Sequence, residues 1–125
     1  MHWHWLAVAL GGAIGALGRY GLNGLIYQVS DHRIPLGTLV VNVLGSFLMG
    51  IFYVLIIEKG VLPVEMRNFL MVGFLGAFTT FSTFSLDALA LWQNGHLLLA
   101  VTYIAASLFL CLLAIACSIW LTRLI

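Results

Sequence analysis

The feature that most constrains this chain is a series of four apolar runs, each about as long as a membrane-spanning helix. A bilayer core of roughly 30 Å requires about 20 apolar residues in a helix. The runs cover residues 3–27, 34–57, 66–92 and 97–121, and most charged residues lie in the short connectors between them. Because the connectors leave no room for an extramembrane domain, we predict one all-helical membrane domain, residues 1–125, with four transmembrane helices.

The composition argues against most soluble proteins. The 125 residues are 63% hydrophobic and 7% charged, whereas soluble domains carry about 25% charged residues. A net charge of +1 without a basic cluster lacks the electrostatic signature of a nucleic-acid-binding protein, so we expect no nucleic-acid partner. The chain has no Ser–His–Asp arrangement, no paired carboxylates within a span and no zinc-like Cys and His set, and we therefore do not expect an enzyme.

The positive charges do not decide how the chain is oriented in the bilayer. Lys59, Arg67 and Arg123 belong to the side that holds both termini. Arg33 belongs to the other side, with Arg19 near the same end of the first span. Three positive residues against two is a small difference for the positive-inside rule. Either other features set the orientation, or copies insert both ways and pair antiparallel.

Small and polar residues form stripes along several spans. Gly11, Gly15 and Gly18 form a ridge that permits close helix packing. At helical spacing, one face of the second span carries Thr38, Asn42, Gly45, Ser46 and Met49. One face of the fourth span carries Tyr103, Ser107, Cys111 and Ser118. Polar groups inside a bilayer require partners, so these two stripes form either interhelical hydrogen bonds or the lining of a narrow hydrated route.

The third span contains a hydroxyl-rich segment near its middle. After two glycines, Gly73 and Gly76, come Thr79, Thr80, Ser82, Thr83 and Ser85. Ser and Thr side chains compete with the helical ladder, and glycine relaxes the limits on the backbone. We therefore predict a helix broken at mid-membrane depth, whose freed carbonyls suit a cation and whose freed N–H and hydroxyl groups suit an anion. Phe81 and Phe84 share a side and face either apolar surroundings or, with positive ring edges, an anion.

Two charged residues fall within the spans. Arg19 is expensive at this depth and either faces protein or water or extends its side chain to the interface. Asp87 is the only acid placed within a span, about one turn past the predicted break, and it is a candidate partner for Arg19.

Three segments together carry a family resemblance: residues 11–20 (GGAIGALGRY), 35–47 (PLGTLVVNVLGSF) and 79–84 (TTFSTF). With these motifs in order along nearly its whole length, the chain resembles the bacterial fluoride ion channels of the Fluc (CrcB) family. The sequence departs from the family pattern at Ala77, where many relatives have glycine, at Cys111, where serine is common, and at Asp87, where glutamate is commoner.

The resemblance implies a fluoride-selective channel that exports cytoplasmic fluoride passively and confers fluoride resistance. It implies an antiparallel, dual-topology homodimer with two pores in the bacterial inner membrane. It implies an anion path formed by Asn42, Phe81, Phe84, Thr80, Tyr103 and Ser107. It also implies a vestibule arginine at Arg19, and a structural sodium ion at the dimer interface held by the backbone carbonyls of Gly76 and Thr79 from both chains.

Two other functions are compatible with four apolar spans. A small multidrug-type exporter would exchange protons for cations through a membrane-embedded acid, but the first span has none and Asp87 lies in the third. A non-transporting membrane subunit would explain the glycines and leave both polar stripes without a use.

Overall fold

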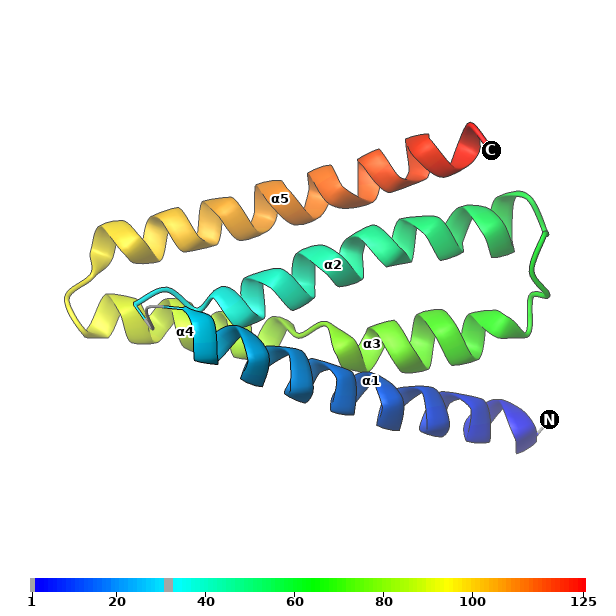
Figure 1. The fold of residues 1–125 in the computed structure, drawn as a ribbon, viewed down its shortest axis with the longest axis horizontal. Helices are drawn as coiled ribbons and strands as arrows, with labels where there is room; N and C mark the ends of the chain where they lie inside the picture. Colours follow the sequence, from blue (N-terminus) through cyan, green and yellow to red (C-terminus); the bar gives the residue numbers. More distant parts are fainter. Residues whose placement is uncertain (1, 31–32) are drawn as a thin grey trace.

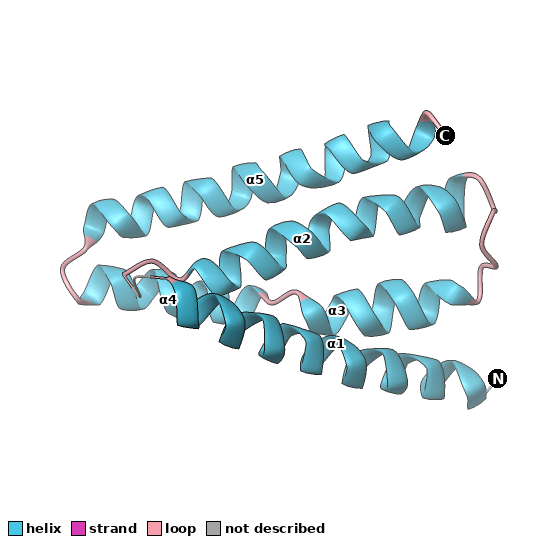
Figure 2. Ribbon diagram, viewed as in Figure 1, coloured by secondary structure: helices cyan, strands magenta, loops and turns pink. Residues whose placement is uncertain are grey.

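The computed structural model describes residues 2–30 and 33–125, and within these ranges every regular element is helical (Figure 1). The elements are α1 (His2–Val29), α2 (Leu36–Phe52), η1 (Tyr53–Glu58), η2 (Arg67–Leu75), α3 (Gly76–Phe78), α4 (Phe81–Gln93) and α5 (Leu97–Arg123). The elements η1 and η2 have the wider turns of a π-helix. Figure 2 shows loops at the two ends of the molecule and one short loop between α3 and α4.

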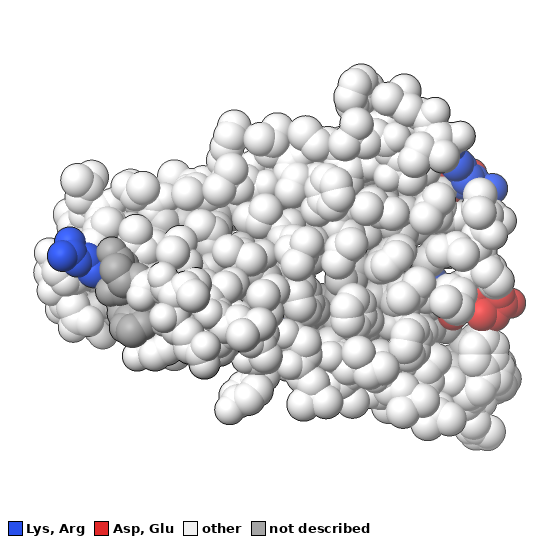
Figure 3. All heavy atoms as spheres, viewed as in Figure 1, with Lys and Arg blue, Asp and Glu red and all other residues white. Residues whose placement is uncertain are grey.

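Four helical stretches of the described chain are long and apolar enough to cross a membrane: His2–Val29, Leu36–Glu58, Arg67–Gln93 and Leu97–Arg123. The prediction of an all-helical chain with four such segments is therefore confirmed. On the face drawn in Figure 3, the charged side chains lie at the two ends, and the surface between them carries no charge. This distribution suits a helical bundle whose middle contacts hydrocarbon.

The turns form where the backbone permits them. Pro35 precedes α2 and supplies no backbone N–H, which the start of a helix does not need. Gly60 and Gly95 have positive φ angles of 63° and 84°, a conformation that glycine adopts at little cost. At one end, Arg123 binds both carboxylate oxygens of Glu58, at 2.8 and 2.5 Å, and so links the last turn of α5 to η1.

The glycine ridge of α1 packs against η2 of the same chain. A β-carbon at Gly11 would clash with the backbone carbonyl of Phe69, and one at Gly15 would clash with the carbonyl of Phe74. At Gly18 the neighbour is the side chain of Phe78, at an ordinary 3.5 Å. The predicted close packing is thus confirmed for the first two glycines, and their neighbour is a helix of the same protomer.

Two small buried clusters lie on either side of the loop between α3 and α4. The first joins α2 to η2 and α3 through Val41, Leu75 and Phe78. The second joins α4 to α5 and is formed by Phe84, Leu91, Ala100 and Tyr103. Both clusters also contact α2, the first through Val41 and the second through the partly buried Leu39.

Candidate pore site

The helical path between α3 and α4 is interrupted at two threonines. Thr79 has φ −89° and ψ 158°, and Thr80 has φ −152° and ψ 121°, so both have extended backbone. The hydroxyl of Thr79 turns back and donates to the carbonyl of Leu75 at 2.9 Å. The hydroxyl of Thr80 accepts from the backbone N–H of Thr83 at 3.2 Å and caps the start of α4. The Thr80 hydroxyl thus satisfies a backbone N–H that the interruption exposes, whereas the Leu75 carbonyl also accepts from the N–H of Thr79 at 3.0 Å.

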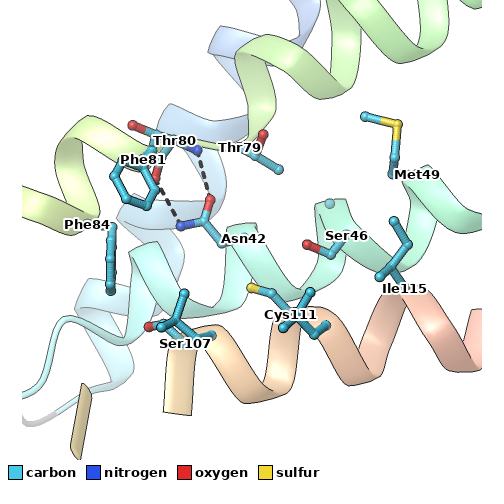
Figure 4. A pocket seen from close by; sticks show the side chains of 13 residues that line it. Asn42, Ser46, Met49, Thr79, Thr80, Phe81, Phe84, Ser107, Cys111 and Ile115 are labelled. Atoms are coloured by element: carbon cyan, nitrogen blue, oxygen red, sulfur yellow. Dashed lines mark hydrogen bonds between the residues drawn. The ribbon is translucent and has the colours of Figure 1, made fainter. Parts of the chain in front are cut away.

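Asn42 of α2 braces the interruption from the side. Its Nδ2 donates to the carbonyl of Thr80 at 3.0 Å, and its Oδ1 accepts from the N–H of Thr80 at 2.7 Å (Figure 4). The side-chain amide therefore pairs with one residue of the backbone as a neighbouring peptide group would. Since Nδ2 carries two hydrogens, and residues 2–30 and 33–125 supply one acceptor for it, one N–H of Asn42 is left for another acceptor.

The carbonyls of Gly76 and Thr79 are among those beside the interruption that lose the donors that an α-helix would give them. In a continuous helix the N–H of Thr80 would donate to Gly76, and the N–H of Thr83 would donate to Thr79. Here the first N–H donates to Asn42 and the second to the Thr80 hydroxyl. The carbonyls of Gly76 and Thr79 are those that the family resemblance gives to sodium, and hard cations prefer such oxygen ligands.

A cavity of about 360 Å³ lies beside the interruption, between α2, α4 and α5 (Figure 4). It brings together six residues singled out in the sequence: Asn42, Thr79, Thr80, Phe81, Phe84 and Ser107. The polar stripes contribute Gly45, Ser46, Met49 and Cys111 as well. Sequence reasoning missed the remaining lining residues, which are Leu108, Leu112 and Ile115. Their only signal was helical spacing, since they lie next to Ser107 and Cys111 on one side of α5.

Ser107 contributes a hydroxyl without a partner. The residue is 6% exposed, and within the described chain its Oγ is a buried side-chain oxygen that forms no hydrogen bond. An unsatisfied buried hydroxyl costs free energy, so such groups are rare away from functional sites. This Oγ belongs to a residue that lines the cavity, as does the free N–H of Asn42.

Three aromatic rings form a row at one end of the cavity. The centroids of Phe81 and Phe84 are 5.4 Å apart, and those of Phe84 and Tyr103 are 5.3 Å apart. The ring planes are inclined by 51° in the first pair and 44° in the second, between the stacked and the edge-to-face arrangements that aromatic pairs prefer. Phe84 and Tyr103 are buried at 8% and 3% exposure, whereas Phe81 is 73% exposed in the single chain. Tyr103 thus contacts the ring of Phe84, which lines the cavity, but does not itself line it.

Comparison with known proteins identifies the family. Residues 6–119 match the CrcB family, described as CrcB-like protein, Camphor Resistance (CrcB). This chain belongs to the CrcB family. It is 53% identical over 119 residues to the fluoride-specific ion channel FluC of Saccharophagus degradans, covering 95% of this chain and 89% of that protein. It is 51% identical over 122 residues to the FluC of Hahella chejuensis, covering 98% and 96%.

Arg19 and Asp87 of this CrcB protein, the two charged residues that the sequence placed within the spans, do not meet. The Nε of Arg19 donates to the carbonyl of Ala77 at 2.9 Å. The carboxylate of Asp87 accepts from the hydroxyl of Tyr103 at 3.2 Å. The expected pair of Arg19 with Asp87 is therefore wrong, because α1 packs against η2 and α3, whereas Asp87 lies in α4 and bonds to α5.

The polar stripe of α5 divides between the cavity and the helix packing. Ser107 and Cys111 line the cavity. Ser118 is fully buried, donates to the carbonyl of Ile115 at 3.0 Å and occupies the space left by Gly50 of α2. The polar stripe of α5 in this CrcB protein thus contains both cavity-lining and helix-packing residues. The helices packed against α5 decide which role each residue has.

Proposed function

We propose that this protein is a fluoride-selective channel that exports cytoplasmic fluoride passively across the bacterial inner membrane and so confers fluoride resistance. Two kinds of observation support the proposal. Relatives about half identical over nearly the whole chain are named fluoride-specific ion channels. The observation that carries it is a cavity lined by uncharged donors, with a free N–H on Asn42 and an unpartnered hydroxyl on Ser107.

The chemistry of the cavity suits a small, strongly hydrated anion. A dry path must replace the water around the ion with protein donors, and a hydrogen bond to a charged group is worth about 1.5–3 kcal/mol. Asn42 and Ser107 supply such donors, and the rings of Phe81 and Phe84 supply positive edges. Because the residues that line the cavity carry no formal charge, the path binds the anion without the tight trapping of a full ion pair.

Transport through such a path needs no energy source beyond the ion gradients. An inside-negative potential of about 100 mV favours the exit of one anion by about 2.3 kcal/mol. The partial positive charge at the start of α4, beside Asn42, adds a favourable potential for an anion at the interruption.

We further propose that the interruption lies at mid-membrane depth and that two oppositely inserted copies complete the channel. Thr79 and Thr80 fall near the middle of the candidate span Arg67–Gln93. In the single chain, Phe81, Ser82 and Ser85 are exposed at this level. The two serine hydroxyls bond within the chain, to the carbonyl of Phe81 and the hydroxyl of Thr80, but they still place polar groups on a surface that would otherwise contact lipid. A second copy covers this surface, and the nearly balanced positive charges favour insertion in both directions.

The carbonyls of Gly76 and Thr79 suit a structural sodium ion between the two copies. Gly76 is exposed, and the helical donors of both carbonyls are taken by side chains. When bound, sodium would supply a fixed positive charge that no change of pH removes. The residues of this chain would contribute the carbonyls of Gly76 and Thr79, whose helical donors bond instead to the side chains of Asn42 and Thr80.

Fluoride efflux from proteoliposomes, measured against chloride with the purified protein, tests the proposed function. We expect rapid fluoride efflux and chloride efflux near that of empty liposomes. Equal efflux of both anions, or none of either, would contradict fluoride selectivity. Proton-coupled uptake of a guanidinium or ethidium cation in place of fluoride efflux would instead favour the exporter.

A further inference from the structure

We propose that Arg19 is a positioning residue, which holds the carboxyl-terminal end of α3 through the hydrogen bond from its Nε. This inference rests on the proposed channel function, and it assigns Arg19 a role other than the vestibule charge that the family resemblance implies. The donor and the acceptor are 58 residues apart in sequence, and the bond length is 2.9 Å.

The acceptor of this bond is a carbonyl that the interruption frees. In a continuous α-helix the carbonyl of Ala77 would accept from the N–H of Phe81. The extended backbone at Thr79 and Thr80 carries that N–H away into α4. The end of a helix also bears a partial negative charge, which a cationic donor offsets. Arg19 therefore supplies both the missing donor and the opposite charge.

Close packing places Arg19 beside this carbonyl. The adjacent turn of α1 carries Gly15, whose missing side chain lets α1 approach the backbone at Phe74 and Phe78. Gly18 faces the ring of Phe78 at 3.5 Å. With the two helices at this separation, the half-buried side chain of Arg19 spans the distance to Ala77.

The hydrogen bond from Arg19 lies where it can fix the backbone conformation beside the interruption. The Ala77 carbonyl is one peptide after that of Gly76 and two before that of Thr79 in the sequence. Asn42 of α2 forms two hydrogen bonds with Thr80, three residues after Ala77. The chain is thus held by α1 at Ala77, just before the interruption, and by α2 at Thr80, within it, and the carbonyl of Thr79 lies between these two attachments.

The vestibule role and the positioning role require different properties of the side chain. A vestibule residue needs the positive charge, which lysine retains. The positioning role needs a donor at Nε, and the glutamine Nε2 lies the same number of bonds from the α-carbon without any charge. Methionine has a similar length and no donor, so Arg19→Gln and Arg19→Met form a matched pair.

The test compares Arg19→Gln, Arg19→Met and Arg19→Lys in the full chain. The first readout is fluoride efflux from proteoliposomes, and the second is amide hydrogen exchange of residues 76–84 in the purified protein. We expect the glutamine variant to keep about half of the wild-type efflux and wild-type exchange. We expect the methionine variant to lose about tenfold or more in efflux and to exchange faster, and the lysine variant to conduct less than the glutamine variant.

Two results would overturn the proposal. The first is that residues 76–84 exchange as fast in the glutamine variant as in the methionine variant. Failure of both variants to fold would count in the same way. The other is a lysine variant with wild-type efflux beside a glutamine variant as poor as methionine, which would assign the effect to charge. The exchange readout needs no fluoride, so a wild-type protein that does not conduct fluoride would refute the channel function and leave this test intact.

Discussion

The replacement of Asn42 by alanine tests both roles that the structure gives to this side chain. Asn42 forms two hydrogen bonds with the backbone of Thr80, and one of its N–H groups remains free beside the cavity. Alanine removes both bonds and the free donor without adding bulk. We therefore expect a loss of stability at the interruption together with a loss of fluoride efflux.

The size of each loss follows from the contacts. A typical hydrogen bond contributes about 1 kcal/mol net, and a buried group left without a partner costs about 1–3 kcal/mol. With the N–H of Thr80 unpaired, and its carbonyl left with the helical bond that it accepts as the N-cap of α4, we expect the free energy of unfolding to fall by about 2–4 kcal/mol. Loss of a hydrogen bond to a charged ligand, about 1.5–3 kcal/mol, corresponds to a fall in rate of about tenfold to a hundredfold.

The assay combines unfolding in detergent with fluoride efflux from proteoliposomes. Asn68→Ala is the matched control, because Asn68 forms one side-chain hydrogen bond, to His4 at 2.8 Å, and lies outside the cavity. We expect this control to lose about 1 kcal/mol of stability and to keep the wild-type rate of fluoride efflux. If Asn42→Ala matched the control in both measurements, the pairing with Thr80 and the role of Asn42 as a donor would both be refuted.

Three further predictions concern the ring row, the unpartnered hydroxyl and the close helix crossing. Phe81→Ile should sharply reduce fluoride efflux, whereas Phe109→Ile, a similarly exposed position outside the cavity, should not; equal efflux in the two variants would remove Phe81 from the path. Ser107→Ala should lower efflux several-fold while leaving thermal stability unchanged or higher, because its buried hydroxyl has no partner to lose; a clear drop in stability would contradict this. Gly15→Ala should lower the free energy of unfolding by about 2 kcal/mol or more, because its β-carbon would overlap a backbone carbonyl of η2. The control Gly21→Ala, with open space around it, should raise it by about 0.5–1 kcal/mol, and an unchanged stability in Gly15→Ala would refute the close crossing.

The position of the interruption was predictable because its signal is local. Five hydroxyl residues follow two glycines in the third span, and such residues offer the backbone alternatives to the helical ladder. The structure gives each threonine a specific use, since Thr79 bonds back to Leu75 and Thr80 caps α4. The roles of Phe81, Phe84 and the sodium ligands in conduction stay predictions.

The long-range partners were not predictable from spacing. The pattern placed Asn42 and Ser118 on comparable polar faces, yet one braces the interruption and the other packs against Gly50. Arg19 and Asp87 suggested an ion pair, and each has a different partner. A periodic pattern identifies which side of a helix is polar, but it does not identify the helix that packs against that side.

By itself the sequence determined the four apolar segments, their helical state and the location of the interruption in the third segment. Each of these depends on residues close in sequence and on the structures that a bilayer permits. The tertiary structure alone decided that Asn42 meets Thr80 and that Arg19 meets Ala77. Those contacts depend on how closely two helices approach. Where α1 meets η2 and α3, that distance is set by backbone atoms against glycines, and beside Asn42 the side chain of Thr79 occupies the space at Gly45.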